Sequence, residues 1–380
     1  MPYSPAISLS DTAVSKTSPR SRLHSEHWPE IDGLRGLAIV LVLCYHLFSD
    51  GVRYIPILGD ALRLGWSGVD LFFVLSGFLV GGILLDNRES PSYFKTFYMR
   101  RACRILPLYF VTLCAIFLIL HFFPANFAHL ALHPPKWPYA TFTQDIWYWI
   151  KNQGDFSGLT ITWTLAIEEK FYLLIPFVIR FLAIDRLKYF LWASLALSLG
   201  YRIAFSMGEW GVGFKGIIRW EGLIAGVLLA IWYRSPGWKE MGRYRTLGWC
   251  LMVALMGEVM FRKYWADGQA TLWAAFDYPF LALAYSILLA NVLSDPSSIT
   301  ARVFRARILR ATGILSYAIY LFHFLVFSCV VALFRHRYGF FWHPYFSAVL
   351  AIGITIALAG ISRWFLESPL IRYGHRFTYR

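Results

Sequence analysis

The most constraining feature of this chain is a succession of long apolar segments that hold few charged residues. A helix needs about 20 mainly apolar residues to cross about 30 Å of hydrocarbon. Only 15% of the residues are charged, against about a quarter in soluble domains. The sequence therefore predicts an all-α polytopic membrane bundle of about ten transmembrane helices. The approximate bounds of the ten segments are 34–49, 66–85, 105–123, 164–182, 187–206, 216–233, 245–262, 271–293, 308–334 and 345–365.

Basic residues occupy alternate connecting segments between these apolar runs. One such segment holds Arg88, Lys95, Arg100, Arg101 and Arg104, whereas the adjacent connections carry only one or two basic residues each. The positive-inside rule places basic segments in the cytosol, so the alternation predicts an even number of spans with both termini cytosolic. The net charge of +14 would suggest nucleic-acid binding in a soluble protein. Its placement instead indicates a topology signal, with the lipid bilayer as partner and no nucleic acid.

The two ends of the chain differ from the apolar body. Residues 1–27 are rich in Ser, Thr and Pro and hold no apolar run, which predicts a disordered cytosolic tail and not a signal peptide. We expect residues 28–370 to form the membrane domain and residues 371–380 a cytosolic tail. The longest external segment, 124–163, contains an amphipathic stretch at 145–150 that is typical of an interfacial helix. The sequence shows no appended soluble domain, so any chemistry is expected within the bundle.

Two ionisable residues lie in the first apolar segment, where a charge costs several kcal/mol and so marks a functional candidate. Arg35 and His46 are eleven residues apart, which at about 100° per residue places them within about 20° of one helix face and about 16 Å apart. This face would carry a cation near the cytosol and an imidazole near the far side. The alternative is that Arg35 snorkels to the interface and His46 forms a hydrogen bond at a helix contact.

An acidic residue stands near the outer end of the second span. Asp70 is expected at a depth similar to that of His46, where a carboxylate could orient the imidazole as a general base. The alternative is that Asp70 interacts with the N-terminus of its own helix.

The fourth span begins with two adjacent glutamates in an apolar setting. Glu168 and Glu169 point about 100° apart on a helix, so at most one of them is expected to face a given cavity. One glutamate could bind an acceptor hydroxyl while the other pairs with Arg202 or Arg219. The alternative is a simple acidic pair at a helix N-terminus.

Two further patterns suggest binding. Arg101 and Arg104 are neighbours at i, i+3 on a cytosolic helix end, a spacing that can grip phosphate but that also serves as a topology signal. Ser316, Tyr320 and His323 share one face of the ninth span at i, i+4, i+7, which predicts a stripe that lines a cavity. The five cysteines show no CxxC pairing, so we expect no metal site and no disulfide framework.

Taken in order, these motifs resemble the acyltransferase-3 family of membrane O-acyltransferases. The matches run from residue 31 to about residue 370, and as a set they are highly specific. One departure is Lys170, where the family often has Gln after the two glutamates. The motifs are Ile31-Asp32-Gly33-Leu34-Arg35-Gly36 with His46, the segment 68–78, Arg101 with Arg104, the segment 163–172, Ser316 to His323, and Glu367-Ser368-Pro369.

The resemblance implies acyl transfer, commonly of acetyl, from cytosolic acyl-CoA to a hydroxyl of an extracytoplasmic sugar, glycan or glycolipid, or in some members a macrolide. It also implies a multi-pass protein of the plasma membrane, which in bacteria is the inner membrane, here in the stand-alone form. The residues expected to act in catalysis are His46, Asp70, Glu168 and Glu169. Those expected to bind CoA phosphates are Arg35, Arg101 and Arg104. Those expected to contact the acceptor are Trp163, Tyr320 and His323.

In the expected mechanism, His46 acts as general base on the acceptor hydroxyl, and a transient acyl-histidine is the competing chemistry. A transporter that flips a glycolipid or an acyl carrier is the alternative from another class. It would use the same intramembrane polar residues as a pathway. Matching motifs in the two halves would favour a transporter, and none are seen.

Overall fold

The computed structural model describes residues 28–52, 58–123, 135–151, 159–206, 219–264, 272–338 and 344–380, and all regular elements within them are helices. Each of the ten predicted apolar segments contains a long helix, as expected where backbone groups must bond internally. The matching helices are α2 (Pro29–Val52), α4 (Gly68–Asp86), α5 (Tyr93–Phe122), α8 (Trp163–Phe181), α9 (Ile184–Ser206), α10 (Glu221–Tyr233), α11 (Arg245–Tyr264), α12 (Asp277–Ser294), α15 (Ser316–Tyr338) and α16 (Pro344–Ser362).

Shorter helices connect or extend these ten. The predicted segment 308–334 is interrupted, because α14 (Arg307–Ile314) ends just before α15 begins. The predicted interfacial stretch at 145–150 lies in a helix, α7 (Gln144–Lys151). The other short helices are α3 (Leu58–Arg63), η1 (Leu64–Ser67), α6 (Trp137–Ala140), η3 (Thr160–Thr162), η5 (Pro236–Tyr244), η6 (Leu272–Phe276), α13 (Ile299–Phe304), η7 (Arg363–Glu367) and α17 (Ser368–Gly374).

Six stretches of the described residues are helical, long and apolar enough to cross a membrane. Helix α10 falls short with 13 residues, and α8 carries Glu168, Glu169 and Lys170 in its first half. The all-α membrane bundle is thereby confirmed, while the number of ten spans and the cytosolic termini stay predictions. The six stretches are Pro29–Phe48, Leu58–Asp86, Tyr93–Phe122, Trp273–Ser294, Ser316–Phe334 and Tyr345–Gly374.

Helix α2 lies at the centre of the bundle and packs against α4, α14, α15 and α16. Small residues permit these close contacts. A Cβ atom added to Gly226 of α10 would lie 2.3 Å from the Val74 carbonyl oxygen of α4, and one added to Gly313 would lie 1.8 Å from the Asp32 carbonyl oxygen of α2. Any larger residue at either glycine would push two helices apart.

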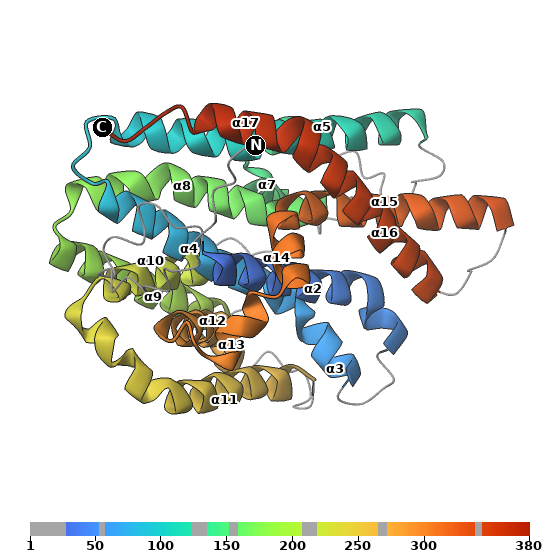
Figure 1. The fold of residues 1–380 in the computed structure, drawn as a ribbon. Helices are drawn as coiled ribbons and strands as arrows, with labels where there is room; N and C mark the ends of the chain where they lie inside the picture. The colour runs from blue at the N-terminus through green and yellow to red at the C-terminus, as the bar shows by residue number, and fades with distance from the viewer. Residues whose placement is uncertain are drawn as a thin grey trace, which may run out of the picture.

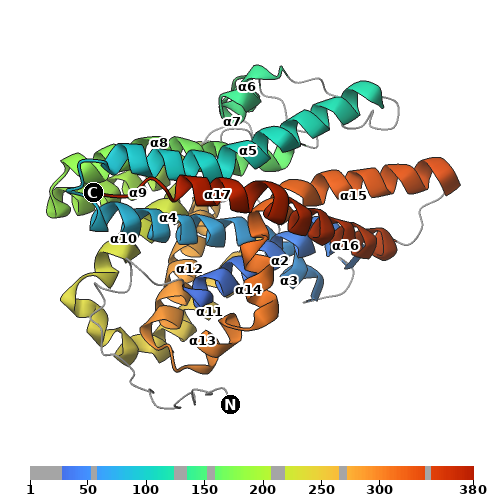
Figure 2. The same cartoon turned by 45° about the horizontal axis from the view of Figure 1, so that its top comes forward.

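The far halves of α5 and α15 extend beyond the rest of the bundle, and α6 and α7 lie beside α5 there (Figure 2). The Tyr109 hydroxyl of α5 holds α6 by donating to the Tyr139 carbonyl at 2.8 Å. At the opposite end the C-terminal segment returns to the start of α5 (Figure 1). There the Ser92 hydroxyl donates to the Thr378 carbonyl at 2.9 Å, so the predicted C-terminal tail packs on the bundle. The predicted N-terminal tail, 1–27, lies outside the described residues.

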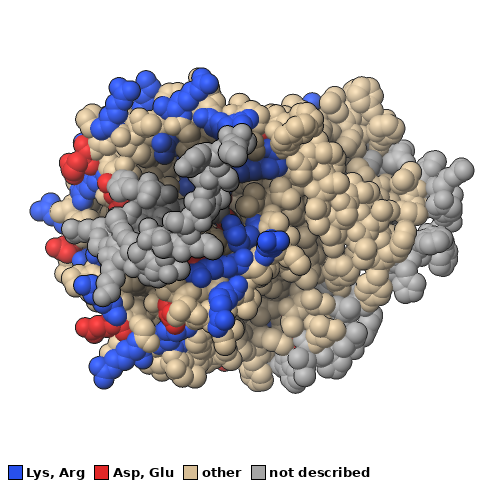
Figure 3. All heavy atoms as spheres, viewed as in Figure 1, with Lys and Arg blue, Asp and Glu red and all other residues tan. Residues whose placement is uncertain are grey.

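Charged side chains are distributed unevenly over the face seen in Figure 3. Lys and Arg gather toward the end where α5 begins and the C-terminus lies, whereas the other end of this face is almost free of charge (Figures 1 and 3). This gathering in space is what the positive-inside rule requires of a cytosolic end. It supports the predicted orientation, in which α5 starts in the cytosol.

Candidate active site

A cavity of about 90 Å³ lies between α2, α4, α5, α8 and α15. Half of the ten predicted site residues line it, although they come from four helices that are distant in sequence. The remaining walls are mainly aromatic and aliphatic side chains, with the hydroxyls of Ser76, Thr164 and Ser316 among them. The predicted residues on the wall are Arg35, Arg101, Arg104, Glu168 and Tyr320.

Three guanidinium groups therefore share this cavity with one carboxylate. Arg35 lies 3.9 Å from Asp32, and the Arg101 guanidinium lies over the Tyr172 ring, 4.6 Å from its centroid. The Arg104 side chain is exposed. Guanidinium groups around one cavity are suited to bind phosphate, because each offers parallel N–H donors to the phosphate oxygens.

The positive field extends outside the membrane-spanning helices to the C-terminal segment. Partial burial, together with the nearby Arg100 and Arg104 guanidinium groups, lowers the pKa of His375 below its ordinary value. Arg100 is held in place because its Nε donates to the Phe377 carbonyl at 2.8 Å. The end of the chain thus borders the basic side of the cavity.

The Glu168 carboxylate is the acidic group of the cavity. Its Oε1 accepts a hydrogen bond of 2.9 Å from the Ser76 hydroxyl of α4. The neighbouring Glu169 does not line the cavity. Lys170 instead forms an ion pair with Asp145 and so ties α8 to α7.

His46 and His323 face each other across α2 and α15, with ring centroids 5.0 Å apart. His46 Nδ1 lies 3.0 Å from the Val42 carbonyl oxygen, and His323 Nδ1 lies 2.7 Å from the Tyr320 carbonyl oxygen. Because a carbonyl only accepts, each neutral ring donates from Nδ1 and keeps a lone pair on Nε2. His323 Nε2 is buried and has no hydrogen-bond partner among the described residues.

Tyr320 connects the histidine pair to the cavity. Its ring lines the cavity and lies 5.7 Å from the His323 ring. Its hydroxyl is 2.9 Å from both the Thr164 hydroxyl and the Ile161 carbonyl. The two histidines are therefore linked to one wall of the cavity through the Tyr320 ring.

The structure replaces the predicted contact between Asp70 and His46 by an ion pair. Both Asp70 carboxylate oxygens accept from Arg219 Nη2 at 2.8 Å, and both side chains are buried. Arg219 also lies over the rings of Tyr278 and Trp163, 4.1 Å and 4.8 Å from their centroids. Asp70 is in the first turn of α4, as the alternative reading had it, but Arg219 lies beside it because the start of α10 packs there.

Nor does either glutamate of α8 pair with the two suggested arginines. Arg202 Nε donates to Glu221 at 2.6 Å, while Arg219 is bound to Asp70. Trp163 does not line the cavity; it packs edge-on against Phe73, with ring centroids 6.4 Å apart. This aromatic and ionic cluster is built at the starts of α4, α8 and α10.

A sequence profile of the acyltransferase domain matches residues 28–363. The chain belongs to the acyltransferase-3 family. It is 27% identical over 374 residues to the peptidoglycan O-acetyltransferase OatA of Listeria monocytogenes, covering 93% of this chain and 57% of that protein. It is 26% identical over 367 residues to the O-acetyltransferase OatA of Staphylococcus aureus, covering 92% of this chain and 58% of that protein. The chain thus spans less than two thirds of either relative, and no solved structure matches it.

Within this acyltransferase-3 chain, sequence reasoning missed several residues of the cavity wall. Tyr172 follows Glu168 at i, i+4, so helical spacing from a predicted site residue could have identified it. Tyr317 also lines the cavity, and its hydroxyl donates to the Ile105 carbonyl at 2.7 Å. It directly follows Ser316, so it lies about 100° around the helix from the predicted stripe.

Among the described residues, no group of three or more His, Cys, Asp or Glu could hold a metal ion.

Proposed function

We propose that this protein is a membrane O-acyltransferase that moves an acyl group, commonly acetyl, from cytosolic acyl-CoA to a hydroxyl of an extracytoplasmic glycan or glycolipid. The observation that carries the proposal is the joining of an arginine-lined cavity, through Tyr320, to a pair of histidines in which His323 is buried and His46 is half-buried. The arginines supply an anion site on the side predicted to be cytosolic. The histidines supply proton-accepting groups deeper in the bundle.

The donor fits this cavity only in part, because about 90 Å³ is far too small for a whole CoA molecule. The exposed Arg104 would meet the phosphates at the surface, with Arg101 and Arg35 further in. The narrow end of the donor, which carries the thioester, would then lie between α4 and α8 near Glu168. Glu168 is already bonded to Ser76, and its charge offsets part of the arginine charge when no donor is bound.

His46 is the proposed general base. The Val42 carbonyl fixes its tautomer, which is the role that had been expected of Asp70. His46 Nε2 would take the proton of the acceptor hydroxyl as the hydroxyl oxygen attacks the thioester carbonyl. The carbon–sulfur bond then breaks, and the protonated imidazole returns the proton to the departing CoA sulfur. The competing chemistry is attack by His46 itself, which would give a transient acyl-histidine.

The acceptor is proposed from the relatives, one of which is named a peptidoglycan O-acetyltransferase. A cell-wall glycan or its lipid-linked precursor would place the protein in the plasma membrane. Tyr320 and His323 are the proposed acceptor contacts, because Tyr320 lines the cavity and its ring lies against that of His323. Trp163 lies in the neighbouring aromatic cluster and not on the cavity wall. A role for it in acceptor binding requires a substrate that extends from the cavity to this cluster.

The test is acyl transfer by purified protein in lipid nanodiscs, with radiolabelled acetyl-CoA and soluble peptidoglycan fragments. We expect label in the fragments with the wild-type protein and at least about a hundredfold less with His46→Ala. Movement of a fluorescent glycolipid across proteoliposomes, without acyl transfer to any glycan, would refute the proposal and favour a transporter.

A further inference from the structure

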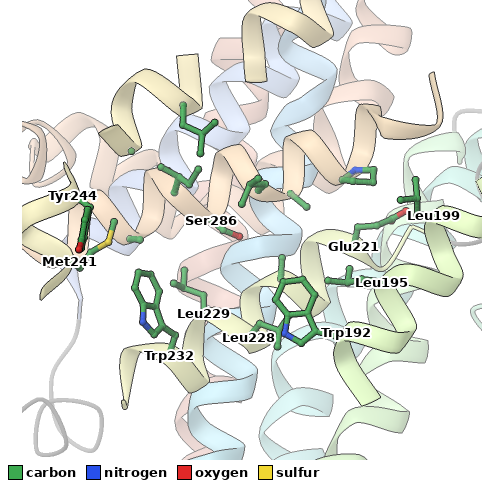
Figure 4. Close-up of a pocket in the computed structure, with 18 of the residues that line it drawn as sticks. Trp192, Leu195, Leu199, Glu221, Leu228, Leu229, Trp232, Met241, Tyr244 and Ser286 are labelled. Atoms are coloured by element: carbon green, nitrogen blue, oxygen red, sulfur yellow. The ribbon is translucent and has the colours of Figure 1, made fainter. Parts of the chain in front are cut away.

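A second and larger cavity lies on the face of α10 that points away from α4. It is bounded by α9, α10, α11 and α12, and its volume is about 740 Å³. Its wall is almost entirely apolar, with Trp192 and Leu195 of α9 facing Leu228 and Leu229 of α10 (Figure 4). This size is within the range of pockets that hold complete small ligands. Helices α4 and α10 separate it from the candidate active site.

The cavity opens toward the bilayer. Several of its apolar lining residues are strongly exposed, including Trp192 at 62% and Leu247 at 65%. Because these helices are predicted to span the membrane, the material outside is hydrocarbon. An apolar cavity gives water no hydrogen-bond partners, whereas a hydrocarbon chain has no hydrogen bonds to lose on entering it. The occupant expected on physical grounds is therefore a lipid chain.

The two ends of the cavity differ in charge. One end reaches Glu221, whose carboxylate is already bonded to Ser198 at 2.7 Å and to Arg202 at 2.6 Å. The other end reaches η5, which also carries Lys239 and Arg243. These two side chains are exposed, and neither forms an ion pair with another described residue. Only the η5 end therefore offers unpaired charge to a ligand, and its net charge is positive because η5 holds these two cations and one exposed carboxylate, Glu240.

We propose that this cavity binds one hydrocarbon chain of an anionic phospholipid, whose phosphate is held by Lys239 and Arg243. The chain would run along α10 from η5 toward Glu221, past Ser286, which points from α12 into the space near Leu229 (Figure 4). On the predicted topology the headgroup belongs to the cytosolic leaflet. The proposal does not depend on acyl transfer, because the cavity shares no residue with the candidate active site.

Photo-crosslinking tests both parts of this proposal, the hydrocarbon chain in the cavity and the phosphate held by Lys239 and Arg243. Phosphatidylglycerol and phosphatidylcholine carrying the same diazirine acyl chain are compared in nanodiscs, and labelled peptides are identified by mass spectrometry. We expect phosphatidylglycerol to label residues 221–294 preferentially. Filling the cavity by Ser286→Trp should lower that labelling at least tenfold. The matched control is Leu118→Trp, which adds the same ring at a position of α5 that is 55% exposed and should leave the labelling unchanged.

The proposed phosphate site is tested by the double variant Lys239→Gln/Arg243→Gln, which changes only exposed side chains and should fold. A basic residue near an anionic surface strengthens binding about fivefold, so the preference for phosphatidylglycerol should fall about 30-fold. The control Arg302→Gln/Arg307→Gln alters two exposed arginines outside the cavity and should keep the preference. Equal labelling by both lipids would overturn the phosphate site. Labelling that survives Ser286→Trp would overturn the cavity assignment.

Discussion

Breaking the ion pair between Asp70 and Arg219 separates a structural role of Asp70 from a catalytic one. Both side chains are almost fully buried, at 5% and 8% exposure, and two hydrogen bonds of 2.8 Å join them. Removing one partner strands a buried charge, which costs about 3–5 kcal/mol. Replacing both by apolar residues of similar size is often neutral. We therefore expect Asp70→Leu and Arg219→Met to be unstable, and the double variant to regain most of the stability.

The assay is a double-mutant cycle, with unfolding free energies measured in detergent and acetyl transfer measured per folded molecule. The control is Arg245→Met, which breaks a pair with Asp295 whose side chains are 24% and 33% exposed and should cost less than about 1 kcal/mol. If Asp70 only holds α4 to the start of α10, the folded double variant keeps most of its transfer rate. A double variant that is stable but slower by about 10²–10⁴ would refute this reasoning, because that is the loss expected when a base is disabled.

Four other predictions concern the candidate site and the topology. Replacing Arg101 and Arg104 by Gln should raise the donor KM, with each lost charge-assisted contact worth about 1.5–3 kcal/mol; an unchanged KM in an inserted variant would leave them as topology signals. His46→Ala should insert and still bind acyl-CoA but lose transfer about 10²–10⁴-fold, and near-normal turnover would exclude it as the base. His323→Ala should reduce transfer less than His46→Ala does. Cysteine labelling should find the segment 124–163 outside the cytosol, and cytosolic labelling would contradict the ten-span topology.

The sequence determined which segments are helical and which of their residues are candidates for chemistry. Helices were predictable because a backbone in hydrocarbon must satisfy its own hydrogen bonds, so a long apolar run has few other options. Arg35, Glu168 and Tyr320 were found because a polar group at membrane depth requires a cavity or a partner, and Arg101 and Arg104 were found from their i, i+3 spacing at a helix end. The structure places all five on one cavity.

Partners across helices were decided only by the tertiary structure. The sequence gives depth and helix face, from which Asp70 and His46 were expected to meet, but it does not tell which helix lies beside which. Close contact between α4 and α10 brings Arg219 to Asp70, and contact between α2 and α15 brings His323 to His46. Helical periodicity is a local property of the backbone, whereas lateral neighbours follow from packing between segments that can be hundreds of residues apart.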